Sequence, residues 1–88
     1  MHRKCRRDAN EKAIVAALRK VGATVEFLDI KDGPDLLVGY MQRNYLFEIK
    51  MDGKELRQGQ IEWKNKWHGQ SFVIRSVDDA LYFIGAIK

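Results

Sequence analysis

Two short apolar runs that lie close together, residues 35–40 and 45–50, most constrain how this chain can fold. Each run has the length and the apolar character of a β-strand. Only four residues, 41–44, separate them, and a connection this short is typical of a hairpin loop. The sequence therefore predicts an antiparallel hairpin, and its register decides which side chains share a face, because a one-residue slip moves every side chain to the other face.

Three charged residues, Asp35, Glu48 and Lys50, stand where these strands should be apolar. Alternation puts Glu48 and Lys50 on one face. If Tyr40 pairs with Tyr45, then Asp35 pairs with Lys50 and has Glu48 as its diagonal neighbour, about 7–8 Å away at the backbone. Two carboxylates this close can share a cation, and oxygen ligands favour Mg²⁺, Mn²⁺ or Ca²⁺ over zinc. A salt-bridged strand end at the surface explains the same charges equally well.

The remaining segments complete an α/β pattern. We expect the order αβββαβα, over residues 8–21, 23–29, 35–40, 45–50, 56–67, 71–75 and 77–84. Asp8 is a suitable N-cap and Gly22 a suitable C-terminal stop for the first helix. Ser76 is expected to cap the last helix, with Asp79 at the capping-box position. Residues 71–75 contain a continuous apolar run that indicates a strand buried on both faces. The sequence thus predicts a mixed β-sheet flanked by helices.

Two polar residues lie on helix faces that should be buried. Glu11 is on the apolar stripe of the first helix, where it faces the sheet, and it also completes a capping box with Asp8. Gln60 is on the stripe of the second helix, and a buried amide needs partners, either core hydrogen bonds or a site. Trp63 and Trp67 share that stripe, and their spacing is more typical of a core or a dimer interface than of base stacking.

The C-terminal segment is more apolar than a monomer of this size needs. It contains Tyr82, Phe83, Ile84 and Ile87. A large apolar patch on a small domain often marks a contact surface. This segment therefore suggests an interface.

Positive charge gathers at the N-terminus. The 88-residue chain has a formal net charge of +4, and residues 1–20 contain seven basic and two acidic residues. A basic arm suits contact with nucleic-acid phosphates, although a solvated chain terminus has the same composition. We expect no membrane span and no signal peptide, because no segment is apolar enough for either. The single cysteine, Cys5, excludes an internal disulfide and favours a reducing cytoplasm.

Several of these residues together spell a known motif. Pro34-Asp35 followed by Glu48-Ile49-Lys50 matches the pattern of the PD-(D/E)XK nucleases. The chain resembles their virus-type replication-repair nuclease branch, called VRR-NUC, from about residue 8 to residue 85. The resemblance includes Glu11, Gly33-Pro34-Asp35-Leu36, Phe47-Glu48-Ile49-Lys50, Gln60 near Trp63, and the tail from Val73 to Asp79. Stand-alone members of this branch occur in phages and bacteria, share the fold of archaeal Holliday-junction resolvases and form homodimers.

The resemblance implies a role for each site residue. It implies a basic arm over residues 1–7 and one nuclease domain over residues 8–88. Asp35 and Glu48 would bind Mg²⁺, or Mn²⁺ in its place, together with the backbone carbonyl of Ile49. Lys50 would assist the attacking water. The supporting residues would be Glu11, as an outer or second-metal ligand, and Gln60, which would orient a phosphate or a water. The residues expected to contact DNA are Arg3, Lys4, Arg6, Arg7, Lys54 and Arg57.

The function implied by this resemblance is metal-dependent hydrolysis of DNA phosphodiester bonds. We expect a homodimeric endonuclease of DNA repair that prefers structured DNA, since no base-reading motif is evident. Two symmetric sites suit paired cuts in a Holliday junction, by analogy with related folds. We expect it in the cytoplasm of a bacterium or a phage-infected cell, without a membrane partner. The alternative is a non-catalytic DNA-binding module that retains the nuclease fold, and a purely structural oligomer is a weaker third hypothesis.

Overall fold

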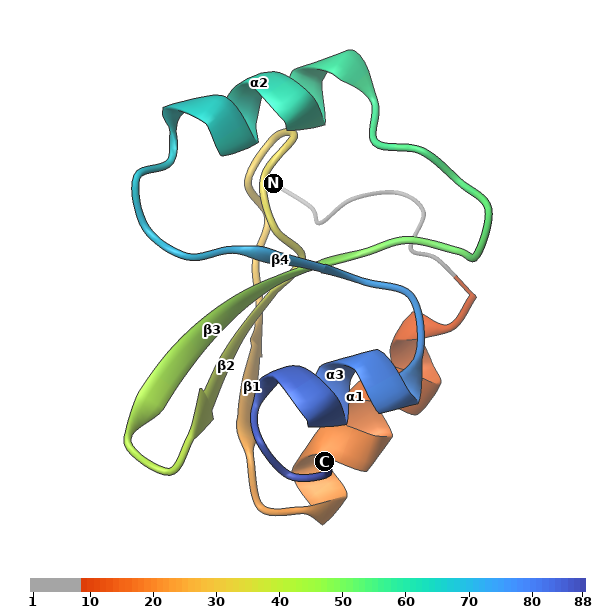
Figure 1. The fold of residues 1–88 in the computed structure, drawn as a ribbon, viewed down its shortest axis with the longest axis vertical. Coiled ribbons are helices and arrows are strands. Elements are labelled where there is room, and N and C mark those ends of the chain that lie inside the picture. The colour runs from red at the N-terminus through yellow and green to blue at the C-terminus, as the bar shows by residue number, and fades with distance from the viewer. Residues whose placement is uncertain (1–8) are drawn as a thin grey trace.

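A computed structural model describes residues 9–88, and these residues form one mixed sheet with helices on both sides. The elements are α1 (Glu11–Lys20), β1 (Thr24–Phe27), β2 (Leu36–Tyr40), β3 (Arg43–Ile49), α2 (Gln58–Lys66), β4 (Phe72–Ile74) and α3 (Val77–Phe83). The strand order is β1-β2-β3-β4, antiparallel except for the parallel β3–β4 pair. Helices α1 and α3 lie together, apart from α2 (Figure 1). The predicted α/β class and mixed sheet are confirmed.

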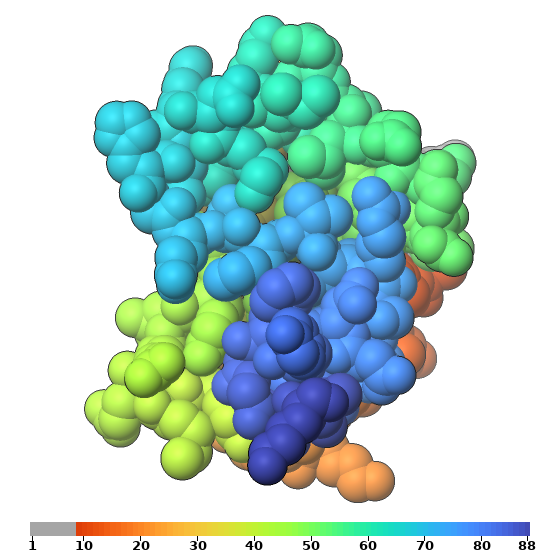
Figure 2. Space-filling view, viewed as in Figure 1, coloured from red at the N-terminus to blue at the C-terminus, as the bar shows by residue number. Residues whose placement is uncertain are grey.

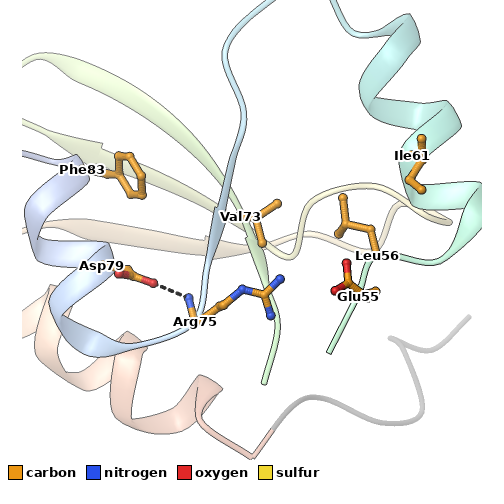
Figure 3. Close-up of a pocket in the computed structure, with 7 residues that line it drawn as sticks. All are labelled: Glu55, Leu56, Ile61, Val73, Arg75, Asp79 and Phe83. Carbon is orange, nitrogen blue, oxygen red and sulfur yellow. Dashed lines mark hydrogen bonds between the residues drawn. The ribbon is translucent and has the colours of Figure 1, made fainter. Parts of the chain in front are cut away.

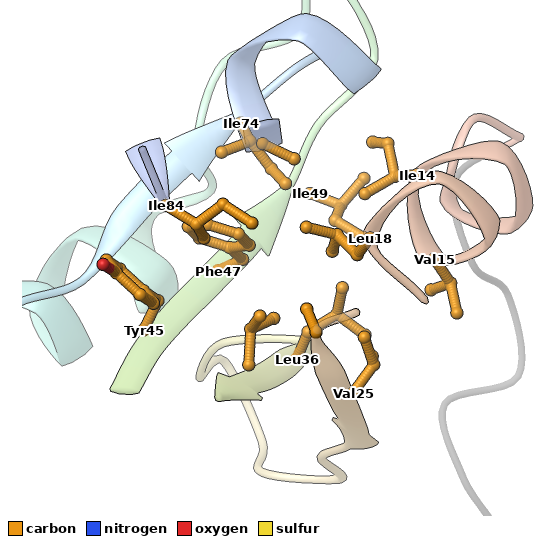
Figure 4. Packing of buried hydrophobic residues seen from close by; sticks show 13 residues of the cluster. Ile14, Val15, Leu18, Val25, Leu36, Tyr45, Phe47, Ile49, Ile74 and Ile84 are labelled. Atoms are coloured by element: carbon orange, nitrogen blue, oxygen red, sulfur yellow. The ribbon is translucent and has the colours of Figure 1, made fainter. Parts of the chain in front are cut away.

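The hydrophobic core lies between the sheet and the helices α1 and α3 (Figure 4). Strand β3 contributes alternate residues, Tyr45, Phe47 and Ile49, and the side chain of Phe47 is fully buried. The other members of the cluster are Ile14, Val15, Leu18, Ala23, Val25, Leu36, Val38, Ile74, Ala80 and Ile84. Because side chains alternate along a strand, Glu48 points away from this core. The two faces of the β2–β3 hairpin therefore differ in chemistry.

The hairpin register differs from the predicted one by two residues. Tyr40 pairs with Arg43 instead of Tyr45, and a two-residue turn replaces the expected four-residue loop. Both turn residues have positive φ, 52° at Met41 and 68° at Gln42, as a type I′ turn requires. The predicted pairing of Asp35 with Lys50 is therefore wrong. A shift of two residues preserves the alternation of faces, so the face assignment within β3 stands.

The helix ends are mostly where the sequence places them. Helix α1 begins at Glu11 with Asn10 at the N-cap position, and the predicted cap, Asp8, lies outside the described residues. Gly22 ends the helix with φ of 98°. Ser76 caps α3, since its side chain accepts a hydrogen bond from the Asp79 amide. The Asp79 carboxylate reaches back to the amide of residue 75, one position before the N-cap. No helix within residues 9–88 is long and apolar enough to cross a bilayer.

Strand β4 is more exposed than the sequence predicted. It is an edge strand, hydrogen bonded within the sheet to β3 alone. Ile74 is buried, whereas Phe72 and Val73 are only partly buried. The prediction of burial on both faces is therefore wrong for two of the three residues, because β4 is the last strand of the sheet and no further strand of residues 9–88 pairs with its outer edge.

Candidate active site

Five polar or charged residues are buried in the part of the chain that the structure describes. They are Glu11, Asp35, Glu48, Lys50 and Gln60, and each is between 3% and 9% exposed. These are the five residues that the sequence singled out for a catalytic role. Burial of a charged group costs free energy unless it is paired or hydrogen bonded. Their position is therefore a stronger sign of a site than the motif alone.

Asp35 lies where β2 begins, beside the end of β3. Its backbone amide donates to the carbonyl of Phe47 at 2.8 Å, and its Oδ2 accepts a hydrogen bond of 2.8 Å from the amide of Ile49. The side chain thus takes the place of a backbone acceptor at the end of the ladder. Although the register differs from the predicted one, the Asp35 carboxylate still lies against the peptide that links Glu48 to Ile49.

Glu48 is held by a hydrogen bond from helix α2. Gln60 donates from Nε2 to Oε2 of Glu48 at 2.9 Å. The other end of the same amide is also engaged, because Oε1 of Gln60 accepts from the Arg57 amide at 2.9 Å, which is the N3-to-N-cap half of a capping box. The first turn of α2 therefore fixes the orientation of the amide and, through it, the Glu48 carboxylate. In this arrangement Gln60 positions Glu48, whereas the resemblance implied contact with a phosphate or a water.

Lys50 lies at the junction of three elements. Its amide donates to the Ile74 carbonyl at 3.0 Å, next to the parallel β3–β4 ladder. Its carbonyl accepts a hydrogen bond of 3.3 Å from Nδ2 of Asn10, which also donates to the Arg75 carbonyl at 2.9 Å. The N-terminus of α1 is thereby fastened to the ends of β3 and β4. Glu11, the residue after Asn10, is buried there, on the helix face that points to the sheet.

The donor set suits a hard divalent cation. Asp35 and Glu48 are two buried carboxylates, and Oδ2 of Asp35 is hydrogen bonded to the amide of Ile49, whose carbonyl is the third oxygen ligand that the resemblance implies. Mg²⁺ is often bound by one or two carboxylates with water completing the octahedron. Among residues 9–88, no group of three or more His, Cys, Asp or Glu side chains is arranged to hold a metal ion. Within these residues the structure therefore does not bring Glu11 together with Asp35 and Glu48 as a three-carboxylate group, and the smaller expected set is the two carboxylates Asp35 and Glu48.

A small cavity adjoins Glu48, and its lining is mainly apolar, with Pro34, Leu56 and Trp63 among the lining residues. Its volume is about 10 Å³, close to the minimum that one water molecule occupies. Glu48 and Gln60 line it together with Lys64 and Ser71. Nζ of Lys64 donates to the hydroxyl of Ser71 at 2.8 Å and to its carbonyl at 3.2 Å. Lys64 and Ser71 are thus joined to each other in this wall, and sequence patterns alone gave no reason to select either residue.

Asp32 is another residue that the sequence did not identify as part of the site. It has φ of 62°, and its side chain packs against the start of α2, where a Cβ on Gly59 would lie 2.5 Å from the carboxylate. Arg57 lies 3.6 Å from the same carboxylate. A negative charge at a helix N-terminus is favourable. This contact fastens α2 above Glu48, and the glycine at position 59, inside a helix, was the signal that could have revealed it.

The predicted DNA-contact residues are only partly described. Lys54 and Arg57 are exposed, and the side chain of Arg57 is engaged with Asp32. The four arm residues, Arg3, Lys4, Arg6 and Arg7, lie outside the described residues. Trp63 and Trp67 stack on each other with ring centroids 5.2 Å apart. Trp63 is half-buried and Trp67 is exposed, so neither is a core residue as defined by full burial.

Comparisons with known proteins add no further support. No protein-family model, no curated protein and no solved structure matches this chain. The resemblance to PD-(D/E)XK nucleases therefore depends on the motif residues themselves.

Proposed function

We propose that this protein is a Mg²⁺-dependent endodeoxyribonuclease of the VRR-NUC type that acts on structured DNA. One observation carries the proposal: the five polar residues buried within residues 9–88 are those that the motif assigns to catalysis. Two of them, Asp35 and Gln60, converge on the Glu48–Ile49 segment through hydrogen bonds. Buried polar groups are costly in stability, and such exceptions are concentrated at functional sites.

Each residue has a part in this proposal. Asp35, Glu48 and the carbonyl of Ile49 would hold the metal ion, which supplies a nucleophilic water and neutralises charge on the phosphate. Lys50, fixed through both of its backbone groups, would place an ammonium beside the negative charge that develops on the phosphate oxygens. Gln60 would keep the Glu48 carboxylate in one orientation. Glu11 would complete the site from α1 as an outer ligand.

The reaction would be hydrolysis of a phosphodiester, with water adding to phosphorus and one P–O bond breaking. DNA is the proposed substrate because the net charge is positive and seven basic residues lie within residues 1–20. A branched substrate such as a Holliday junction, a homodimeric state and a cytoplasmic location are the further parts of this proposal. They rest on the resemblance and on the lack of a base-reading motif in the sequence.

Cleavage of labelled four-way junctions and linear duplexes tests the proposal, with Mg²⁺, Mn²⁺ or EDTA. Asp35→Asn and Glu48→Gln remove one charge each but keep an oxygen that can accept the hydrogen bonds from Ile49 and Gln60. Both variants should lose at least about 100-fold in cleavage rate while they stay folded. Glu26→Gln is the matched control, because Glu26 is an exposed carboxylate on β1 of the same sheet. Its rate should equal that of the native chain.

The same assay separates the alternative function. A non-catalytic DNA-binding module would bind the junction with strong salt dependence and cut it in no metal. Binding that is unchanged by Asp35→Asn, without cleavage, would overturn the assignment of a nuclease. Cleavage in EDTA would overturn the role of the metal.

A further inference from the structure

The outer edge of β4 carries a continuous surface with unusual composition. A groove of about 410 Å³ flanks the C-terminal end of the strand, and a second groove of about 440 Å³ flanks the N-terminal end. Phe83 of α3 lines both. We call the two grooves together the β4-edge surface. Figure 3 shows the first groove, with Leu56 and Ile61 on one side of β4 and Phe83 and Asp79 on the other.

The middle of this surface is apolar. Phe72 and Phe83 stack with ring centroids 4.7 Å apart, and both remain partly exposed. Val73, Leu56 and Ile61 extend the apolar area toward α2. In the space-filling view, β4 and α3 (blue) lie on the face toward the reader, below α2 (teal) (Figure 2). An apolar centre with a polar rim is the composition of a protein interface.

The two edge strands of the sheet are protected differently. Strand β1, at the opposite edge, has the charged residue Glu26, and the Arg19 guanidinium lies 5.8 Å from the ring centroid of Phe27. Strand β4 consists of Phe72, Val73 and Ile74 and has no charge or proline. Natural edge strands usually carry such residues, because an apolar edge invites pairing with another chain. The contrast between the edges indicates that β4 is the edge that a partner covers.

The rim has charges of both signs, one at each end. Arg43 lines the groove at the N-terminal end of β4, whereas Glu55 and Asp79 line the groove at the C-terminal end. Arg75 also lines that groove, and although its NH1 donates to the carbonyls of Met51 and Lys54 it keeps its charge, so the C-terminal end has two carboxylates against one guanidinium and is acidic. A two-fold axis that sets two β4 edges antiparallel brings opposite ends together. The Arg43 of each copy then faces the acidic end of the other.

We propose that the β4-edge surface is the contact between two copies of this chain. The two β4 edges run antiparallel, Phe83 lies near the two-fold axis, and Arg43 of each copy faces Glu55 of the other. Such an isologous contact needs a patch that is complementary to itself, and this patch combines an apolar centre with opposite charges at its two ends. The contact refines the homodimer named in the proposed function, but it is derived from the edge surface and does not require nuclease activity.

Sedimentation equilibrium of the full chain tests the contact, because it measures the mass in solution. Concentrations from about 1 to 100 µM resolve micromolar dissociation constants. Phe83→Glu should weaken the dimer by at least about 30-fold, as expected for a central contact residue. Phe27→Glu is the matched control, because Phe27 and Phe83 are both 37% exposed and lie at opposite edges of the sheet. It should leave the dimer intact. Ile61→Glu provides a second disruptive variant on α2 if Phe83→Glu does not fold by circular dichroism.

A charge exchange tests the register. Arg43→Glu and Glu55→Arg should each weaken the dimer by about 10-fold, because each brings like charges together. The double variant should recover most of the native affinity. A native chain that is monomeric throughout this range would overturn the contact, as would a dimer that Phe83→Glu and Ile61→Glu leave unchanged. Loss of DNA binding in Phe83→Glu without a change in mass would mean that the surface contacts nucleic acid instead.

The result is independent of the cleavage assay. Failure of cleavage with a dimer that responds to these variants would remove the nuclease proposal and keep the contact. Cleavage by a chain that stays monomeric would remove the contact and keep the nuclease proposal.

Discussion

The two faces of β3 come from alternate residues of one seven-residue strand, and each face has a buried residue toward the end of the strand, yet the faces differ in chemistry. On one face Phe47 is fully buried in the hydrophobic core. On the other face Glu48 is 8% exposed and is held by an amide from α2. Burial alone therefore does not distinguish the core from the candidate site. What distinguishes them is that the core face is apolar, whereas the other face needs specific hydrogen bonds to tolerate its charges.

The largest expected effect is a loss of stability when the apolar face of β3 is disrupted. Phe47→Ala should lower the free energy of unfolding by about 3–5 kcal/mol, because it leaves a cavity among Leu36, Ile74 and the other core residues. Denaturation by urea, followed by circular dichroism, measures this loss. Leu46→Ala on the same strand is the control, since Leu46 is only half-buried and lies outside the core cluster. An equal loss in both variants would contradict the comparison.

The next largest effect is a loss of cleavage rate, with the fold kept, when a charge is removed from the buried polar residues. Lys50→Met keeps most of the side-chain volume but removes the charge. It should lower the rate of metal-dependent DNA cleavage by about 100-fold, because the developing negative charge loses its cation. The free energy of unfolding should change by less than about 1 kcal/mol, since removal of a buried charge offsets the lost contacts. Native cleavage by the variant would contradict the role given to Lys50.

A smaller effect separates positioning from contact with the substrate. Gln60→Ala removes the hydrogen bond to Glu48 and one from the Arg57 amide, and should cost about 1–3 kcal/mol of stability. If Gln60 acts through Glu48, the variant needs more Mg²⁺ for half-maximal cleavage, with the affinity for DNA unchanged. A change in DNA affinity alone would indicate contact with the phosphate instead. Glu62→Ala, an exposed change on the same helix, is the control.

The smallest expected effect is a gain in stability from a better turn in the β2–β3 hairpin, whose register decides which residues share a face. Met41 and Gln42 have positive φ, which costs free energy for residues other than glycine and asparagine. The double replacement Met41→Asn and Gln42→Gly matches the type I′ turn and should raise the melting temperature, with a gain of about 1 kcal/mol. Cleavage should not change, because the turn lies at the end of the hairpin away from Asp35. A lower melting temperature would show that the turn is not of this type.

The sequence predicted most elements because their signals are local. The stripes of α1, the turn at Gly22 and the cap at Ser76 depend on neighbours three or four residues away. The burial of Glu11 and Gln60 was predicted in the same way, from their place on apolar helix faces. The hairpin register was predicted incorrectly because Met-Gln is not a typical turn sequence, so nothing local marked the two-residue turn.

Contacts between distant segments could not be predicted from such signals. Asn10 bonds to the ends of β3 and β4, 40 and 65 residues away in the chain. Asp32 packs on the first turn of α2, and Lys64 bonds to Ser71 beside the small cavity. The side chains that take part are ordinary polar residues. Their partners become known only when the elements are packed together.

The sequence by itself determined the element types, the alternation of faces along β3 and the five polar residues that a core should not contain. These properties follow from the periodicity of the backbone, which each segment expresses alone. Only the tertiary structure decided that Asp35 bonds to the Ile49 amide, that Gln60 reaches Glu48 and that β4 is left at an open edge. Those outcomes depend on the register and packing of segments far apart in the chain, where the free energy of the whole fold selects among locally equivalent arrangements.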